Sequence, residues 1–272
     1  MRGLVREEIE GLRSPLAARV ELHETIRSTQ ERARELAREG APHGTLVVSE
    51  VQTGGRGRLG RRWGSPPGGL WMSLVLRPGI STEVAARTTQ AAAVGVVKAL
   101  RELGVEARIK WPNDVLVDGR KVCGILAESS SESAPVAAKR TGRGGGRLVD
   151  FVVLGVGVNA NLDPEDLGVV GREVTTLRAE LGHDVDLTEL LRSLLSHLDA
   201  ELGRIEDFGS ILEDWRALNC TLGERVRVRR FGEELEGTAL DLGPEGELLL
   251  QTPEGVVELF EGEIEHLRRE RT

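Results

Sequence analysis

The chain of 272 residues has no tyrosine and only two cysteines, Cys123 and Cys220, neither of which belongs to a C-x-x-C pair. Two cysteines form at most one disulfide, so a disulfide framework is excluded and a reducing cytoplasm is the expected location. No hydrophobic run is long enough to span a bilayer, and the N-terminus lacks the continuous apolar core of a signal peptide. The sequence therefore predicts a cytoplasmic protein without a membrane segment.

Basic residues are fewer than acidic ones: the chain has 36 lysines and arginines and 44 aspartates and glutamates, which gives a formal net charge of -8. This balance, with aromatic residues at only 3%, argues against non-specific binding of nucleic acids but leaves local basic sites open. Hydrophobic residues at 39% suffice for an ordinary core, and the length suits one large domain or a main domain with a small one.

Helical and strand patterns alternate along the chain up to residue 218. Helices are expected over 28–40, 83–103, 188–204 and 210–217, and strands over 45–51, 69–76, 107–110, 115–117, 121–128 and 151–159. The serine- and glycine-rich segment Ser129–Arg147 is predicted to be a loop. From residue 225 onward, four short alternating segments between Gly and Pro turns predict a small β-barrel, with a domain boundary near 219–223.

The most unusual motif is the arginine loop, Gly54–Trp63, in which glycines alternate with arginines directly after an expected strand. Glycine lets the backbone approach a ligand closely, and the arginine fork matches carboxylate and phosphate oxygens. The loop contains G-x-G-x-x-G, but Pro66 and Pro67 follow where a dinucleotide site needs a helix, and no kinase motif is present. What remains is an anion-binding loop ending in Trp63, whose flat ring suits either stacking on a purine or core packing.

A second cluster, Lys110–Asp114, follows a short predicted strand. Pro112 restricts the preceding residue to extended angles, which places Lys110 on a rigid segment where its charge can neutralise a phosphate. Asn113 and Asp114 are equally typical of a turn, and a single carboxylate makes a poor metal site.

A third cluster, Gly155–Asn161, ends the most strand-like run of the sequence. Alternating Gly and Val residues allow another backbone or a flat ligand to approach the strand. The amide of Asn159 offers both a donor and an acceptor, the pattern needed to read an adenine edge, but asparagine is also an ordinary residue at the end of a strand.

Together these motifs resemble the biotin protein ligase family. The matching elements, in the family's order, are Ser28-Thr29, the arginine loop, Lys110–Asp114, Cys123–Glu128 and Gly155–Asn159, within a similarity over about residues 22–268. The resemblance implies an α+β fold. A catalytic domain over 1–218, with a mixed sheet and flanking helices like a class II synthetase, would precede an SH3-like β-barrel over 219–272.

The resemblance also implies the chemistry. The family activates the biotin carboxylate with ATP as biotinyl-5′-adenylate, with Mg²⁺ offsetting the charge of pyrophosphate, and transfers biotin to a lysine of the biotin carboxyl carrier domain of acetyl-CoA carboxylase. Catalytic roles are implied for Lys110, Arg56 and Arg58; no metal ligand is assigned. The biotin site would consist of Ser28, Thr29, Gln30, Gln52, Arg56, Gly57, Arg58 and Lys110, and the nucleotide site of Arg56, Arg58, Trp63 and Asn159.

Two alternatives stay open. Lipoate ligases and octanoyltransferases share this architecture, although the arginine loop together with Lys110–Asp114 favours biotin. A non-enzymatic nucleic-acid-binding module is a different class, which the acidic net charge and the lack of a second basic stripe disfavour. The stretch before residue 22 is too short for the helix-turn-helix domain of the family's repressors, so DNA binding is not expected. Family members often form homodimers, but the sequence does not fix the oligomeric state.

Overall fold

The computed structural model describes residues 3–130, 148–167 and 174–267, so the loop predicted over 129–147 lies almost wholly outside the described residues. A larger sheet contains β1 (Arg19–Ile26), β2 (Thr45–Gln52), β3 (Leu70–Leu76), β4 (Arg108–Lys110), β5 (Asp114–Val117), β6 (Arg120–Ser129) and β7 (Val152–Val158). A smaller sheet contains β8 (Arg225–Arg230), β9 (Glu233–Leu242), β10 (Leu248–Thr252), β11 (Gly255–Leu259) and β12 (Glu263–His266). The α-helices are α1 (Arg6–Glu10), α2 (Thr29–Arg38), α3 (Thr82–Ala86), α4 (Thr88–Glu102), α5 (Leu177–Leu181), α6 (Leu187–Gly203) and α7 (Phe208–Leu218).

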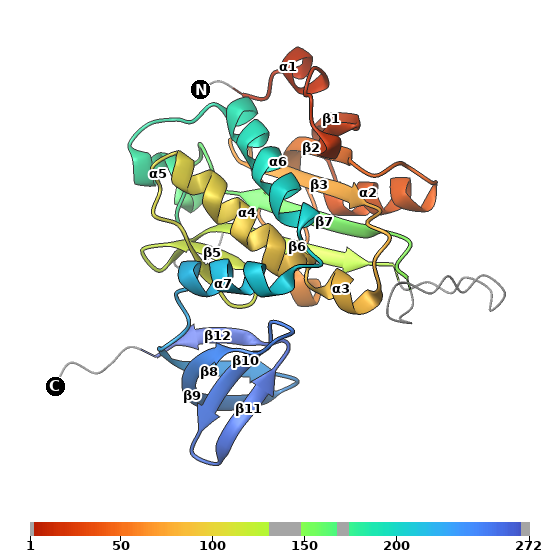
Figure 1. Ribbon diagram of the computed structural model, residues 1–272. Helices are drawn as coiled ribbons and strands as arrows, with labels where there is room; N and C mark the ends of the chain where they lie inside the picture. The colour runs from red at the N-terminus through yellow and green to blue at the C-terminus, as the bar shows by residue number, and fades with distance from the viewer. Residues whose placement is uncertain (1–2, 131–147, 168–173, 268–272) are drawn as a thin grey trace.

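The two sheets divide the chain into a helix-covered part and an all-β part (Figure 1). The larger sheet has the order β1-β2-β3-β7-β6-β5-β4, with β1 and β2 parallel and the other neighbours antiparallel. The smaller sheet is antiparallel throughout, in the order β11-β10-β9-β8-β12. The expected α+β fold, a mixed sheet with flanking helices followed by a small β unit, is confirmed.

Several local features differ from the sequence prediction, which also lacks the short helices α1 and α5. The helix expected over 83–103 is two helices, because the chain turns at Arg87, whose guanidinium lies 4.6 Å from the Phe208 ring and 2.7 Å from the Glu245 carboxylate. The edge strand β1 is not predicted because its side chains are mostly exposed or half-buried and give no clear alternation. The short strand β12 is likewise not predicted, since three of its four residues are polar.

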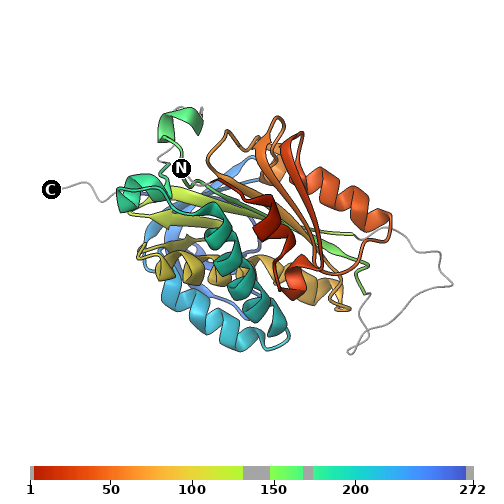
Figure 2. The same cartoon turned by 90° about the horizontal axis from the view of Figure 1, so that it is seen from above.

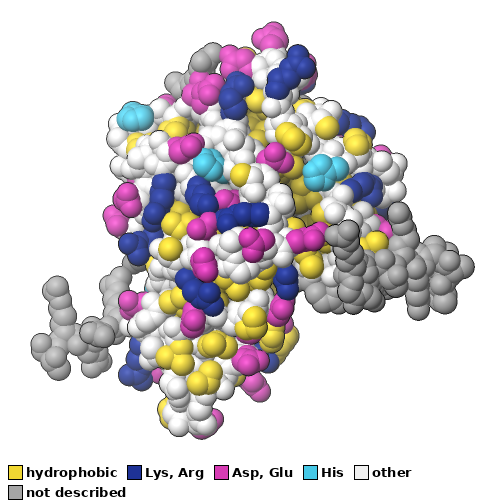
Figure 3. Space-filling model, viewed as in Figure 1, with side chains coloured by type: hydrophobic (Ala, Val, Ile, Leu, Met, Phe, Trp, Pro, Cys, Tyr) yellow, Lys and Arg dark blue, Asp and Glu magenta, His cyan; other side chains and the backbone are white. Residues whose placement is uncertain are grey.

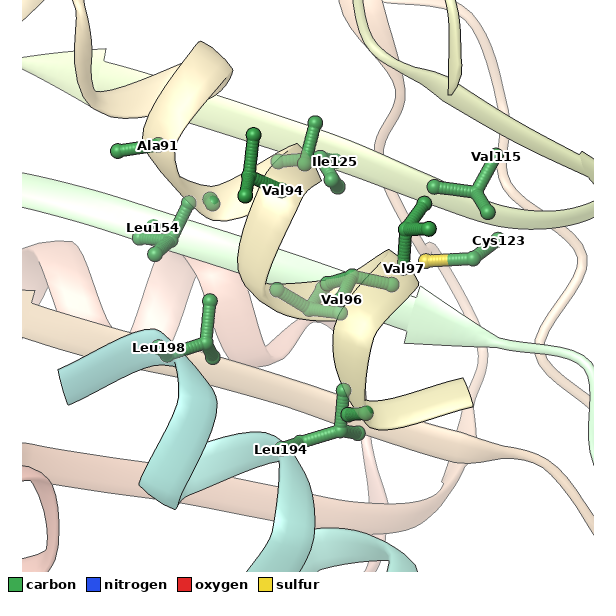
Figure 4. Close-up of a cluster of buried hydrophobic side chains, with 14 of the residues drawn as sticks. Ala91, Val94, Val96, Val97, Val115, Cys123, Ile125, Leu154, Leu194 and Leu198 are labelled. Carbon is green, nitrogen blue, oxygen red and sulfur yellow. The ribbon is translucent and has the colours of Figure 1, made fainter. Parts of the chain in front are cut away.

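Helices cover the two faces of the larger sheet unequally (Figure 2). On one face, α4 packs on β4, β5 and β6, and α6 and α7 pack on α4. Val94 and Val97 of α4 face Ile125 and Cys123 of the sheet, and the leucines of α6 lie beside α4 (Figure 4). On the other face α2 covers only the end of the sheet formed by β2, β3 and β7. No described helix packs on the rest of that face.

The strand sequences explain why this second face is hollow. Successive side chains of a strand point to opposite faces, so Val152, Leu154 and Val156 of β7 enter the core beneath α4, while Gly155 and Gly157 face the other way. Gly124 of β6 lies on the same open face as Gly157, with which it is paired across the two strands. Because glycine has no side chain, Gly124 and Gly157 form a floor where no described helix covers the sheet, and Gly155 lies beside it against Gln30 of α2.

The outer surface carries mixed charges. Acidic and basic side chains are interspersed over the helical part, whereas hydrophobic side chains gather on the smaller sheet, where Leu240, Val256 and Phe260 are exposed (Figure 3). Within the described ranges, no helix combines the length and the apolar character required to cross a bilayer.

Candidate active site

A cleft of about 790 Å³ lies over the glycine floor, between the two sheets. Gly124, Gly155 and Gly157 line its base, and the arginine loop and Lys110–Asp114 line its sides. The smaller sheet contributes a wall through β12 and the preceding Gly262. Three contacts fix that wall: Trp111 Nε1 donates to Gly246 O at 3.3 Å, Arg216 Nε donates to Asp241 Oδ1 at 2.7 Å, and Arg61 pairs with Glu263.

One end of the cleft is a buried polar network around the start of α2. Gln52 Oε1 accepts from the backbone N–H of Thr29 at 2.8 Å, and Gln52 Nε2 donates to Ser65 Oγ at 2.8 Å. The Thr29 hydroxyl lies 2.9 Å from Ser73 Oγ, which donates to Gln30 Oε1 at 3.1 Å. Thr29, Gln30, Gln52 and Ser73 line the cleft, so this end can recognise a small polar ring by hydrogen bonds.

The arginine loop is a narrow hairpin. Its ends are joined by hydrogen bonds from Trp63 N to Gly55 O at 2.9 Å and from Gly57 N to Arg61 O at 2.8 Å. A Cβ on Gly55 would lie 2.5 Å from Trp63 O, so only glycine permits this approach of the two backbones. Leu59, at the tip, has a φ of 55° and is exposed. The loop therefore holds its arginines at fixed places along one side of the cleft.

Arg58 is the loop arginine that turns into the protein, whereas Arg56, Arg61 and Arg62 are exposed. Its Nη1 donates to Asn113 Oδ1 at 2.9 Å, and Asn113 Nδ2 donates to Ile125 O at 2.6 Å. Burial lowers the pKa of Arg58, an effect that the charges of Asp114 and Glu261 oppose. Because an arginine starts from a very high pKa, the group stays cationic and gives the cleft a fixed positive charge.

Lys110 supplies a second cation at the end of β4 and lines the cleft. Burial is the main cause that lowers the pKa of His266 in β12, and the charge of Lys110 lowers it further. The charge of Glu224 opposes this shift. Arg56 lies 3.6 Å from Glu31 at the start of α2. The cleft thus joins a polar, hydrogen-bonding end to a cationic middle, an arrangement that suits a ligand with an anionic group beyond a polar ring.

Trp63 lies flat on the glycine floor. A Cβ on Gly157 would be 2.6 Å from its Nε1, and one on Gly124 would be 2.9 Å from its ring. Lys121 Nζ stands 5.0 Å from the centre of the indole, and Lys121 also pairs with Asp114 at 2.5 Å. The indole N–H is buried and has no hydrogen-bond partner among the described residues.

Asn159 is buried directly after β7, two residues beyond Gly157. Its Nδ2 donates to Lys121 O at 3.3 Å and to Thr175 O at 3.1 Å, whereas its Oδ1 has no hydrogen-bond partner within residues 3–130, 148–167 and 174–267. A buried acceptor without a partner costs free energy unless a ligand or water satisfies it.

Cys123 is buried, Cys220 is half-buried, and neither lines the cleft. Burial raises the pKa of the Cys220 thiol to about 11, although the charges of Lys110 and Arg108 oppose the shift. Burial also raises the pKa of Cys123 far above its usual range. Because the thiolate is the reactive form, chemistry in this cleft has to come from bound reactants rather than from a cysteine.

The structure brings most of the predicted site residues together. The cleft is lined by Thr29, Gln30, Gln52, Arg56, Gly57, Arg58, Trp63 and Lys110. Ser28 and Asn159 do not line it: Ser28 Oγ accepts from Glu31 N at 3.4 Å and caps α2, and Asn159 is buried just beyond the end of β7. Sequence reasoning missed Ser73, Lys121 and β12. A polar residue within the apolar run of β3 was a signal for Ser73, but no local signal marks β12.

Comparisons with known proteins agree with this geometry. A model of the biotin/lipoate A/B protein ligase family matches residues 22–142, and a model of the biotin protein ligase C-terminal domain matches residues 221–267. The bifunctional ligase/repressor BirA of Bacillus subtilis is 36% identical over 248 aligned residues, covering 89% of this chain and 72% of that protein. The chain belongs to the biotin protein ligase family. The biotin–[acetyl-CoA-carboxylase] ligase of Paracoccus denitrificans is also 36% identical, over 84% of this chain and 92% of that protein.

The solved structures extend the family likeness to the whole fold. The biotin protein ligase from Aquifex aeolicus in complex with biotin and ATP matches with a TM-score of 0.74 and 29% sequence identity. The match covers 93% of this chain and 100% of that chain. The family inferred from the motifs is thereby confirmed, and the likeness includes both the catalytic sheet and the C-terminal β unit.

Proposed function

We propose that the chain is an ATP-dependent biotin–protein ligase, which forms biotinyl-5′-adenylate and transfers biotin to a lysine of a carrier protein. The observation that carries this proposal is the single cleft in which a polar end, at Thr29 and Ser73, leads to the cations Lys110 and Arg58. Biotin has the matching shape, with a polar ureido ring at one end and a carboxylate at the other. The family relationship supports the same function.

The first step joins two anions, so positioning and charge neutralisation dominate it. A biotin carboxylate oxygen attacks the α-phosphorus of ATP, a carboxyl–phosphate bond forms, and pyrophosphate leaves with the electrons of the broken bond. We assign to Lys110 and Arg58 the neutralisation of the carboxylate and α-phosphate while they approach, with Arg56, on the same loop as Arg58, as a third cation. In the second step the acceptor amine attacks the acyl carbon, AMP leaves, and the amine loses a proton to solvent.

We assign the nucleotide to the part of the site near Trp63 and Asn159. Trp63 offers an indole face, and Asn159 Oδ1 is an acceptor without a partner among the described residues, which suits the exocyclic amine of adenine. Because Trp63 rests on Gly124 and Gly157, and Asn159 does not line the cleft, we infer that the loop shifts when the base enters.

Mg²⁺ is proposed to arrive with the nucleotide. In the part of the chain that the structure describes, no group of three or more histidine, cysteine or acidic side chains is placed to hold a metal ion, and Asp114 is engaged by Lys121. Such a donor set fits a metal held mainly by phosphate oxygens and water. The metal would offset charge on the leaving pyrophosphate.

The carrier partner is proposed to be a biotin carboxyl carrier domain of acetyl-CoA carboxylase, as in the name of the Paracoccus relative. A cytoplasmic location agrees with the free state of both cysteines. Homodimer formation and the domain boundary at 218/219 stay predictions.

ATP–pyrophosphate exchange tests the proposed reaction directly. We expect exchange when biotin is supplied, and none when lipoate or octanoate is supplied alone, because only biotin carries ring N–H groups for the polar end of the cleft. Exchange with lipoate but not with biotin would make the chain a lipoate ligase. No exchange with any of the three acids, together with salt-sensitive binding of nucleic acid, would favour the non-enzymatic alternative.

Replacing Trp63 tests the nucleotide site. Trp63→Ala should raise the KM for ATP about tenfold, since a lost base–aromatic stack costs roughly 1–3 kcal/mol, and should leave the KM for biotin within about twofold. Trp63→Phe keeps an aromatic face, so its KM for ATP should lie between those of the unaltered chain and Trp63→Ala. Leu59→Ala, at the exposed tip of the same loop, is the matched control. An equal rise in both KM values would mean that Trp63 only maintains the loop.

A further inference from the structure

A chain of hydrogen bonds runs from a surface ion pair to the polar end of the cleft. Arg34 of α2 pairs with Glu128 of β6, and Glu128 Oε2 accepts from Gln30 Nε2 at 2.9 Å. Gln30 Nε2 also donates to Val153 O at 3.1 Å, and Gln30 Oε1 accepts from Ser73 Oγ at 3.1 Å. The chain therefore continues from Glu128 through Gln30 to Ser73, which lines the cleft.

The chemistry of these partners fixes the direction of every bond in the chain. A carboxylate and a backbone carbonyl accept hydrogen bonds and cannot donate them, so the NH₂ group of Gln30 must face Glu128 and Val153. Its carbonyl oxygen must then face Ser73, which has to donate its only hydroxyl proton to it. The amide cannot flip without placing its oxygen against two acceptors. Gly155 permits this seat, because a Cβ there would lie 2.5 Å from Gln30 Oε1.

The consequence reaches Thr29. With the proton of Ser73 committed, the 2.9 Å contact between the two hydroxyl groups leaves Ser73 as the acceptor and Thr29 as the donor. The other neighbour of the Thr29 hydroxyl is Gln52 Oε1 at 3.1 Å, which is also an acceptor. Whichever neighbour takes its proton, that proton points into the protein. Toward the cleft, both hydroxyl oxygens offer lone pairs and no proton.

We propose that Gln30 and Glu128 are positioning residues that fix Thr29 and Ser73 as hydrogen-bond acceptors, and that this polarity selects a ligand with N–H donors. The inference rests on the proposed function, in which the two N–H groups of the biotin ureido ring occupy this end of the cleft. Gln30 then acts through Ser73, since both N–H donors of its amide and one lone pair of its oxygen already have protein partners. A dithiolane ring or an alkyl chain gives these acceptors no donor and leaves them unsatisfied.

A double-mutant cycle tests this polarity relay. Gln30→Met keeps the length of the side chain but releases the Ser73 hydroxyl, and should raise the KM for biotin about five- to tenfold in the exchange assay. Because the ureido ring is remote from the reacting carboxylate, kcat and the KM for ATP should stay within about twofold. Ser73→Ala should have a similar effect on biotin. In the Ser73→Ala background, adding Gln30→Met should raise the KM for biotin by less than about a further twofold.

Glu128, which is partly exposed, provides a second test that does not disturb the buried end of the network. Glu128→Ala should raise the KM for biotin about threefold by freeing the Gln30 amide, while Glu128→Gln, which retains an acceptor oxygen, should restore it. The relay would be overturned if the effects of Gln30→Met and Ser73→Ala on the KM for biotin were additive in the double variant. A fall in kcat without a change in the KM for biotin would also overturn it. Absence of biotin-dependent exchange in the unaltered chain would instead overturn the proposed function, and with it the ligand assigned here.

Discussion

Lys110→Ala is expected to slow formation of biotinyl-adenylate by about a hundred- to a thousandfold. The lysine lies at the end of β4 and lines the cleft, where its charge also lowers the pKa of His266. Two anions have to meet during adenylate formation, and a fixed ammonium lowers their repulsion most at the moment of closest approach. Its removal should therefore act on the transition state far more than on the bound substrates.

The measurement that separates these effects is single-turnover adenylate formation beside equilibrium binding of biotin. We expect biotin affinity to change by less than about tenfold, because the ureido end keeps its hydrogen bonds. Arg108→Ala is the matched control, since Arg108 is an exposed cation on the same strand and does not line the cleft. A rate close to that of the unaltered chain would remove Lys110 from the mechanism, and an equal loss of affinity would make it a binding residue only.

The site was predictable from sequence where a residue type has few alternative uses. Glycines at Gly155 and Gly157 within an apolar strand pointed to a close approach, and strand alternation places both on the face opposite the core. The arginine loop was recognisable because four arginines among glycines have no role in a core. Ser28 Oγ caps α2 by accepting from Glu31 N, and its contact with biotin stays a prediction.

Other parts of the site depend on tertiary packing and left no local trace. β12 reaches the cleft only because contacts such as those of Trp111 with Gly246 and Arg216 with Asp241 seat the smaller sheet there. The break at Arg87 likewise follows from contacts with Phe208 and Glu245, which lie far along the chain. The direction of the hydrogen bonds around Gln30 needs all its neighbours at once, so a single-residue pattern cannot reveal it.

Arg58→Gly should convert the chain from a selective ligase into one that releases its reactive intermediate. Arg58 is the half-buried arginine of the loop, held by Asn113, which is itself bonded to the backbone of β6. We expect this anchored guanidinium to lie over the phosphate of the adenylate and to slow its escape. Loss of a charged hydrogen bond corresponds to about a ten- to hundredfold faster release.

Released biotinyl-adenylate acylates any accessible amine, so the expected readout is biotin on the lysines of a bystander protein such as albumin, in the absence of a carrier. Arg58→Lys keeps the charge but loses the fork that reaches Asn113, and should give intermediate labelling. Arg62→Gly removes the same charge from an exposed position of the loop, where the guanidinium donates to Thr53 O, and should label the bystander no more than the unaltered chain does. If Arg58→Gly labels only the carrier, the loop binds substrates without retaining the intermediate; if both glycine variants label the bystander equally, retention depends on the net charge of the loop and not on the anchored Arg58.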